Sequence, residues 1–321
     1  MTIKGIMFFV GGLSIFLFGL NYMREALIKI SSQRIKKFIS SAASNKFRAL
    51  VTGIVASTFI QSSSGVTAIV VALVSSNLMT IYQGIMVMIG ANIGTTTTAF
   101  IFTLQIENYS LFIVFTGFFL SYFNNSKINR IGEILVGLGL LFLGIYIMNN
   151  FYKSFMATDT IINYTMKFSN NRITSFVVGT IISALIQSSS GTINIIQNLY
   201  YIEAINFRPA VSMMLGANLG TTIASLIVAI SASKAAKTAV NVNILFNLIG
   251  GVIFIIILTP YCNMLNFFKS HTTMFPNKKI MIAYSHLFYN IATTIIFYFA
   301  YDWIINKIIM KTPKNKLTHQ F

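Results

Sequence analysis

The chain has 321 residues, of which 55% are hydrophobic and 9% are charged. Soluble domains carry about a quarter charged residues, so this composition excludes a soluble globular protein and indicates a helical membrane protein. The net charge of +17 would suggest nucleic acid binding in a soluble protein. Here the basic residues lie between apolar runs, where membrane topology and anionic lipid explain them, so no nucleic acid partner is expected.

The first half of the chain contains apolar segments of the length that crosses a bilayer, about 20 residues each. Its predicted elements, in chain order, are a span at 5–23, a basic loop at 24–48, a re-entrant hairpin at 47–76, and spans at 78–104 and 109–123. The hairpin is expected because polar residues and a glycine interrupt its apolar sequence. Broken backbone inside a membrane is tolerated only where protein or a watery cavity surrounds it.

The second half repeats this order. Its predicted elements are a span at 131–149, a polar loop to Arg172, a second hairpin at 173–202, and spans at 207–231, 237–259 and 281–305. A hairpin leaves the membrane on the side that it enters, so each repeat crosses three times and the second repeat is inverted. We therefore predict an all-α integral membrane protein with seven crossings: two inverted repeats, each with a re-entrant hairpin and a broken helix, and one extra C-terminal helix. The corresponding units are a first repeat at 1–125, a second repeat at 126–260, and the extra helix with its basic tail at 261–321.

Basic residues set the predicted orientation, because they favour the cytoplasmic side of a membrane. The loop 24–48, Lys127, Arg130 and the C-terminal tail would face the cytoplasm, whereas the loop 150–172 carries three basic residues and would face outside. This distribution predicts an N-terminus outside and a C-terminus in the cytoplasm, in the plasma (inner) membrane.

Two polar motifs each occur twice, and the later copy lies 126 positions after the earlier one. The first motif is Gln61-Ser62-Ser63-Ser64-Gly65, repeated as Gln187-Ser188-Ser189-Ser190-Gly191. The second is Gly90-Ala91-Asn92-Ile93-Gly94-Thr95-Thr96, repeated as Gly216-Ala217-Asn218-Leu219-Gly220-Thr221-Thr222. A duplicated polar motif in an apolar chain is typical of a transporter built from two repeats.

Three serines before a glycine make a poor helix interior, so the chain is expected to break at each first motif. A broken helix leaves unpaired N–H groups that bind anions, and serine hydroxyls can donate to an oxyanion or accept a cation. The candidate anion-binding residues are Gln61, Ser62, Ser63, Ser64, Gln187, Ser188, Ser189 and Ser190. A single membrane serine usually just bonds the preceding turn, but a doubled cluster favours a binding site.

The second motif predicts a sodium site. Glycines on either side of each asparagine permit unwinding, and freed carbonyls with threonine hydroxyls would form an all-oxygen cage. The alternative is a close helix crossing of small residues, and both can hold together. The candidate sodium ligands are Gln61, Asn92, Thr95, Thr96, Gln187, Ser188, Asn218, Thr221 and Thr222.

Charged residues are scarce near the motifs. No carboxylate lies beside either motif in sequence, which favours sodium over proton coupling. The core is expected to lack Lys and Arg apart from Arg208, so that co-bound cations and helix N-termini would balance an anion. His286 is expected to be a packing residue rather than a proton carrier, and Asn194 and Asn198 are further cation-site candidates.

No enzymatic constellation emerges from the sequence. It contains no P-loop, zinc-ligand pair, nucleophile elbow or catalytic carboxylate pair. We therefore expect a protein that is not an enzyme and that uses no cofactor, with sodium acting only as a coupling ion.

The two Gln-Ser-Ser-Ser motifs, each followed by Gly-Ala-Asn-(Ile/Leu)-Gly-Thr-Thr, resemble the type II sodium/phosphate cotransporter family. The resemblance implies that inorganic phosphate moves with sodium, with the serine motifs in re-entrant hairpins that meet near the membrane centre. Many bacterial relatives continue into a regulatory domain resembling the phosphate-uptake regulator PhoU. This sequence ends at Phe321 without one, so a separate PhoU-like regulator is an expected partner.

The expected function is sodium-coupled transport of inorganic phosphate by alternating access. Three alternatives stay open: transport of another oxyanion or a phosphorylated metabolite, phosphate export, and a non-transporting membrane sensor of phosphate.

Overall fold

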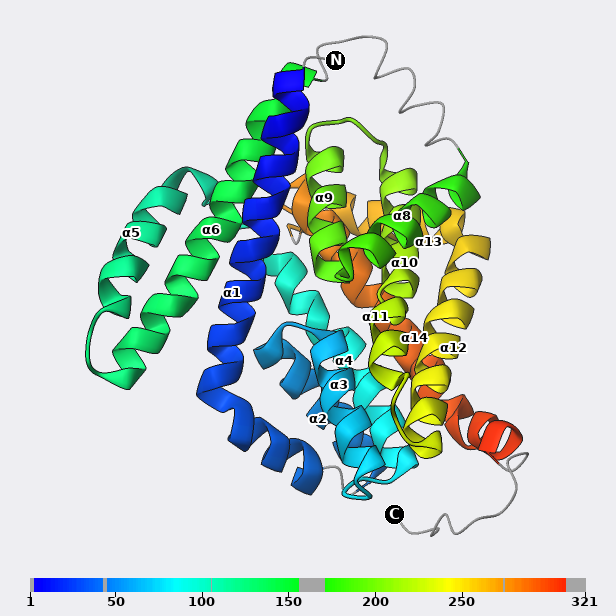
Figure 1. The fold of residues 1–321 in the computed structure, drawn as a ribbon. Helices are drawn as coiled ribbons and strands as arrows, with labels where there is room; N and C mark the ends of the chain where they lie inside the picture. The colour runs from blue at the N-terminus through cyan, green and yellow to red at the C-terminus, as the bar shows by residue number, and fades with distance from the viewer. Residues whose placement is uncertain (1–2, 43–44, 105, 156–170, 274, 310–321) are drawn as a thin grey trace.

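The computed structural model describes residues 3–42, 45–104, 106–155, 171–273 and 275–309, and these residues form helices without strands. The helices are α1 (Ile3–Ala42), α2 (Lys46–Ile60), α3 (Ser63–Ser75), α4 (Ile81–Ile101), the 3-10 turn η1 (Glu107–Tyr109), α5 (Ser110–Ser121), α6 (Ser126–Phe155), α8 (Arg172–Ile186), α9 (Ser189–Tyr201), α10 (Phe207–Gly220), α11 (Thr222–Ala229), α12 (Lys234–Ile256), α13 (Leu258–His271) and α14 (Lys278–Ile309). Figure 1 shows α1 beginning at one end of the molecule and α14 ending at the other.

Within the described part of the chain, six helical segments are long and apolar enough to span a membrane. They are Met7–Lys29, Ile81–Ile101, Ser126–Asn149, Phe207–Ala229, Lys234–Ile256 and Lys278–Tyr301. The sequence-based expectation of seven crossings differs because the span expected at 109–123 forms α5, which has 12 residues. Such a helix is about 18 Å long, shorter than the ~30 Å hydrocarbon core of a bilayer.

Two segments expected to be loops are helical. The basic loop expected at 24–48 continues α1 to Ala42, because residues 24–42 contain no glycine or proline to end the helix. The connection expected between 259 and Lys279 contains α13, which carries Pro260 in its first turn, where a proline is tolerated.

Helices α1 and α6 pack as a close pair that glycines make possible. A Cβ atom added at Gly19 would lie 2.4 Å from the nitrogen of Leu141, and one at Gly144 would lie 2.4 Å from the nitrogen of Phe16. The pair encloses its own core with Phe142, which is fully buried. Helix α5 packs on the other side of α6 and exposes aromatic side chains such as Phe112, which is 71% exposed (Figure 1).

The second sequence motif forms close helix crossings rather than two unwound segments. In α4, Cβ atoms added at Gly90 and Gly94 would lie 2.1 and 2.2 Å from carbonyl oxygens of α2. Gly216 and Gly220 of α10 approach α8 in the same way, at 2.0 and 2.2 Å. Because α4 is continuous through its motif, the expected unwinding is wrong there. In the second copy the helix is interrupted only at Thr221, between α10 and α11.

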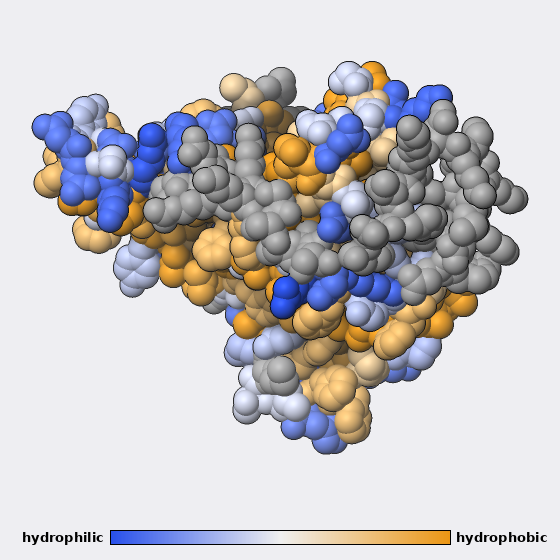
Figure 2. Space-filling model, turned by 90° about the horizontal axis from the view of Figure 1, so that it is seen from below, coloured by the Kyte–Doolittle hydropathy of each residue, from blue (hydrophilic) through white to orange (hydrophobic). Residues whose placement is uncertain are grey.

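The remaining helices complete two further cores. One joins α2, α3 and α4 to α12 and the later part of α14, and the other joins α9, α10 and α13 to the earlier part of α14. The helix pairs α2–α3 and α8–α9 each form a hairpin (Figure 1). Seen from below, separate patches of hydrophilic residues lie between areas of hydrophobic surface (Figure 2).

Candidate functional site

Each serine motif forms the turn of a helical hairpin, and the two turns have the same local structure. Helix α2 is followed by Gln61 with φ of 54°, and α8 is followed by Gln187 with φ of 55°. The following serines, Ser62 and Ser188, then cap the next helix: their Oγ atoms accept the amide N–H groups of Gly65 and Gly191 at 3.1 and 3.2 Å. The predicted break at each motif therefore occurs, and each capping serine accepts a hydrogen bond from an amide group that the break leaves without a helical partner.

The left-handed backbone at both glutamines is costly for a residue with a side chain, about 1–2 kcal/mol each. It appears at the same motif position in both copies, at Gln61 and Gln187. A repeated strained turn favours a functional reason for the sharp reversal, because strain persists where the surrounding structure requires it. Here the reversal aims the N-terminus of the next helix at one point.

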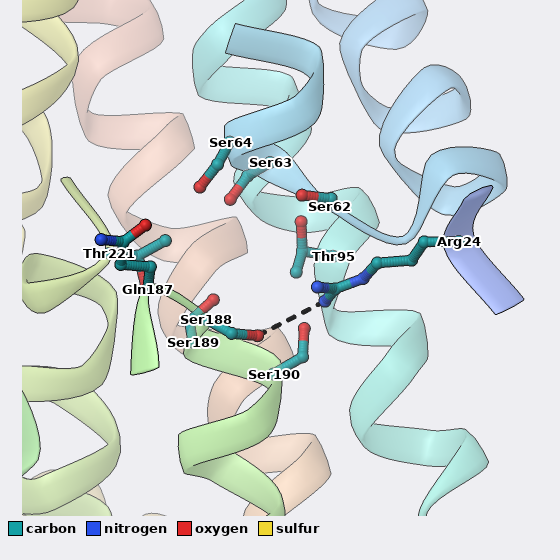
Figure 3. A pocket seen from close by; sticks show the side chains of 10 residues that line it. All are labelled: Arg24, Ser62, Ser63, Ser64, Thr95, Gln187, Ser188, Ser189, Ser190 and Thr221. Carbon is teal, nitrogen blue, oxygen red and sulfur yellow. Dashed lines mark hydrogen bonds between the residues drawn. The ribbon is translucent and has the colours of Figure 1, made fainter. Parts of the chain in front are cut away.

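That point is a pocket where the two hairpins meet (Figure 3). Its lining residues are Arg24, Ser62, Ser63, Ser64, Thr95, Gln187, Ser188, Ser189, Ser190 and Thr221. Helices α3 and α9 leave the pocket in opposite directions (Figures 1 and 3). The structure thus brings together seven of the eight candidate anion-binding residues, and Gln61 is the one that does not line the pocket.

Helix N-termini supply free donors to this pocket. The amide groups of Ser63 and Ser64 are the first two of α3, and those of Ser189 and Ser190 are the first two of α9. Such amides have no intrahelical acceptor, and they carry the positive end of the helix dipole. The hydroxyl of Ser190 is 2% exposed and has no hydrogen-bond partner. This arrangement favours an anion with several oxygens.

Arg24 is the lining residue that the sequence did not reveal. It lies on α1, and its Nη2 donates to the Oγ of Ser188 at 3.4 Å (Figure 3). Its Nε is buried without a hydrogen-bond partner. The expectation of a core without Lys or Arg near the motifs is therefore wrong. Arg24 lies in a basic stretch that resembles a loop, and the continuation of α1 places it at the pocket instead.

Four of the candidate sodium ligands line the pocket: Gln187, Ser188, Thr95 and Thr221. The two threonines each form a buried hydroxyl pair with a serine of the neighbouring hairpin: Thr95 with Ser57 at 2.7 Å, and Thr221 with Ser183 at 2.9 Å. The serine and threonine of the second pair follow those of the first by the same 126 positions. Hydroxyl oxygens of this kind are ligands that a hard monovalent cation accepts.

The other five candidate sodium ligands do not line the pocket; they are Gln61, Asn92, Thr96, Asn218 and Thr222. The hydroxyls of Thr96 and Thr222 donate to carbonyls one turn back, at 2.7 and 2.6 Å. Asn92 donates to Asn243 of α12 at 3.3 Å. These three side chains tie helices together or close their own turn, which is the ordinary use of such residues in membrane helices.

Asn218, the second-copy counterpart of Asn92, contacts α14. Its Oδ1 lies 2.9 Å from Nε2 of His286, and its Nδ2 donates to Asn290 at 3.4 Å. His286 is 1% exposed in this network, as expected of a packing residue. The side chains of Asn194 and Asn198 bond each other at 3.0 Å within α9, away from the pocket lining.

Comparison of the sequence with known proteins identifies the family of this chain. The sequence profile of the Na+/Pi-cotransporter family matches residues 15–150 and, again, residues 154–289. "Uncharacterized protein YqeW" of Bacillus subtilis is 24% identical over 88% of this chain and 90% of its own length. "Putative inorganic phosphate export protein YjbB" of Escherichia coli is 22% identical over 89% of this chain, which spans about half (52%) of that protein.

A shorter match extends to an animal protein. The human "Sodium-dependent phosphate transport protein 2B" is 36% identical over 91 residues, which are 28% of this chain and 13% of that protein. No solved structure matches. The profile covers most of the chain in two consecutive copies, and the chain therefore belongs to the Na+/Pi-cotransporter family.

Proposed function

We propose that this protein is a secondary transporter that moves inorganic phosphate coupled to sodium. The observation that carries the proposal is the pocket where two serine motifs and two helix N-termini converge. Amides and hydroxyls that point at one small space suit a tetrahedral oxyanion, which accepts hydrogen bonds at every oxygen. Ser62, Ser63, Ser64, Ser189 and Ser190 are its proposed phosphate donors, with the Gln187 amide at the rim.

The lining of the pocket favours an inorganic ion over a phosphorylated metabolite. Its residues are serines, threonines, a glutamine and an arginine, whereas typical small-molecule sites are lined mainly by apolar and aromatic side chains that hold an organic group. Competition with sugar phosphates would test this point: a metabolite that displaces phosphate at equal concentration would contradict the argument.

Sodium is proposed to bind at the pocket wall, beside the anion. The hydroxyls of Thr95 and Thr221 supply neutral oxygens to this wall, and each hydrogen-bonds to a buried serine that does not itself line the pocket, Ser57 or Ser183. A cation bound there strengthens anion binding, and by linkage the anion strengthens cation binding to the same extent. Gln61, Asn92, Thr96, Asn218 and Thr222 fit this role less well, because they do not line the pocket.

Alternating access is proposed to occur around this central pocket by the motion of two inverted repeats. The opposite directions in which α3 and α9 leave the pocket support inversion and re-entrant hairpins. The placement of the first residues of α1 and the last of α14 at opposite ends supports termini on opposite sides of the membrane. Phosphate export is the second candidate, because YjbB relatives that match most of this chain carry that name.

The deciding experiment is radiolabelled phosphate flux into proteoliposomes, with an inward sodium gradient or with choline in place of sodium. Sodium-dependent accumulation is expected, and orientation-resolved vesicles separate uptake from export. Ser63→Ala with Ser189→Ala should reduce flux at least about 10-fold, since each removes a donor to a charged ligand. Ser76→Ala is the matched control, because its hydroxyl bonds Ala72 within α3 and lies outside the pocket.

Phosphate binding without flux would favour the sensor alternative. Flux that is equal in sodium and choline would remove sodium from the mechanism while leaving the anion pocket in place.

A further inference from the structure

We propose that Arg24 is a phosphate-binding residue, a fixed positive charge that makes the pocket select doubly charged oxyanions. This inference rests on the proposed function and deepens it. Its first support is position: Arg24 comes from α1, outside both hairpins, and its guanidinium reaches the space between the two serine motifs (Figure 3).

The second support is that Arg24 lacks a negative partner. None of the ion pairs among the described residues includes it. Its Nε is shielded from solvent and makes no hydrogen bond, and its contact to the protein is a long one, 3.4 Å to Ser188. A buried guanidinium without a carboxylate is costly, and proteins retain such a group where a ligand completes it.

The third support is the effect of Arg24 on Ser188. The Oγ of Ser188 accepts from Arg24 and also from the amide of Gly191. With both lone pairs occupied, the hydroxyl can only donate its proton, which suits an anion and not a cation. Ser62 has the same capping bond to Gly65 and accepts no hydrogen bond from Arg24, so one of its lone pairs stays available. Arg24 therefore assigns Ser188 to phosphate rather than to sodium.

The lining of the pocket explains why charge would decide selectivity. Apart from Arg24, the lining residues are serines, threonines and a glutamine, all neutral. The guanidinium fork and the two helix N-termini attract each oxyanion in proportion to its charge. A doubly charged anion gains most, and no carboxylate in the described lining opposes it.

Binding of radiolabelled phosphate to the purified full chain tests the proposal, without any need for transport. We expect R24Q to weaken phosphate binding about 10- to 100-fold, as the loss of a charged hydrogen-bond donor does. R24K keeps the charge without the fork and should recover part of that loss. R208Q is the matched control, because Arg208 is exposed and lies outside the pocket, and its phosphate affinity should equal that of wild type.

Two further measurements separate a ligand role from a structural one. Sulfate and perchlorate are both tetrahedral and differ in charge, so sulfate should compete better with phosphate in wild type and this advantage should shrink in R24Q. Without phosphate, the melting temperature of R24Q should be equal to or above that of wild type, because an uncompensated buried charge is gone. R24Q should also lose most of the stabilisation that phosphate gives.

Several outcomes would overturn the proposal. R24Q that binds phosphate within about 2-fold of wild type would exclude Arg24 as a ligand. A lower melting temperature of both R24Q and R24K without phosphate would assign Arg24 to the packing of α1. Wild type that binds neither phosphate nor sulfate would remove the anion site. Binding that depends on Arg24 without any flux would support this inference and contradict the proposed transport function.

Discussion

The two hairpin units of this chain, α2–α4 and α8–α10, share a backbone plan and differ in what surrounds it. In both units a glutamine in the left-handed region precedes a capping serine, and glycines bring the hairpin against the following helix. Even the turns after α3 and α9 correspond, since Asn77 and Glu203 both have positive φ, at 57° and 63°. The shared features all shape the route of the backbone into the pocket.

The differences lie in polarity and burial. Ser188, Ser189 and Ser190 are buried, at 7%, 5% and 2% exposure, whereas Ser62 to Ser64 are half-buried. Helix α9 is polar, with buried Asn194, Gln197 and Asn198, whereas α3 presents valines to its core. The hydrogen bond of Arg24 goes to Ser188 of the second motif. We infer that the shape of the pocket requires both copies of the hairpin unit. Charge and polarity can come unequally from the two copies, and this allows one pocket to hold both an anion and a cation.

The strongest test of the shared geometry is to place a methyl group in both crossings. Gly90→Ala and Gly216→Ala put a Cβ about 2 Å from the carbonyls of Leu50 and Phe176, so each helix must move away. We expect each to cost about 3 kcal/mol or more and to reduce the yield of folded protein. Thermal unfolding in detergent and size-exclusion profiles measure this.

Gly11→Ala is the control for these crossings, because no atom outside its own helix lies within 4 Å of the added Cβ. If one crossing tolerates alanine and the other does not, the two units do not share the same packing.

Removing the threonine hydroxyl from each of the two serine–threonine pairs at the pocket wall should lower the stability of the protein by unequal amounts. Thr95→Val removes the partner of Ser57, which is fully buried, and we expect a cost of about 1–3 kcal/mol. Thr221→Val is expected to cost about 1 kcal/mol, because Ser183 keeps its hydrogen bond to the carbonyl of Ala217. Denaturant unfolding compares the two variants, and an equal or reversed order would contradict the difference seen between the pairs.

The two motif glutamines should differ in phosphate affinity. Gln187 lines the pocket and Gln61 does not. Gln187→Ala should weaken phosphate binding about 10-fold, whereas Gln61→Ala should change it by about 3-fold or less. Equilibrium binding of labelled phosphate measures both, and a larger effect at Gln61 would mean that a different conformation binds the anion.

We expect the smallest effect at the turn after α9, where Glu203 occupies the position that Asn77 occupies after α3. The hydrogen bond from Lys278 at 2.6 Å, and then the charge of that lysine, lower the pKa of Glu203. A lowered pKa contributes stability above the unfolded-state pKa, and this contribution is lost as the pH falls through the folded-state pKa. The melting temperature of wild type should therefore fall slightly at acidic pH, and Glu203→Gln should abolish this decrease. Lys278→Gln should do the same, and combining the two should add nothing further.

The sequence predicted the elements whose signal is local. Apolar length predicted the helical class, and the serines before Gly65 and Gly191 predicted the breaks, because serine caps compete with the helix interior. The resemblance carried by the duplicated motifs implied that the two breaks would meet at one site, and both serine motifs do line the same pocket. These inferences depend on spacing along the chain, which a sequence displays directly.

Tertiary structure alone decided which polar side chains face the pocket. Asn92 and Thr95 are three residues apart in one motif, yet Asn92 turns to α12 and Thr95 to the pocket, since each helical residue faces its own direction. Arg24 is 37 positions before the first motif and reaches it because α1 stays helical and packs against α2. The sequence therefore determined that a polar site exists in an apolar chain. The packing of helices decided which residues form it, because contacts between distant segments leave no local pattern.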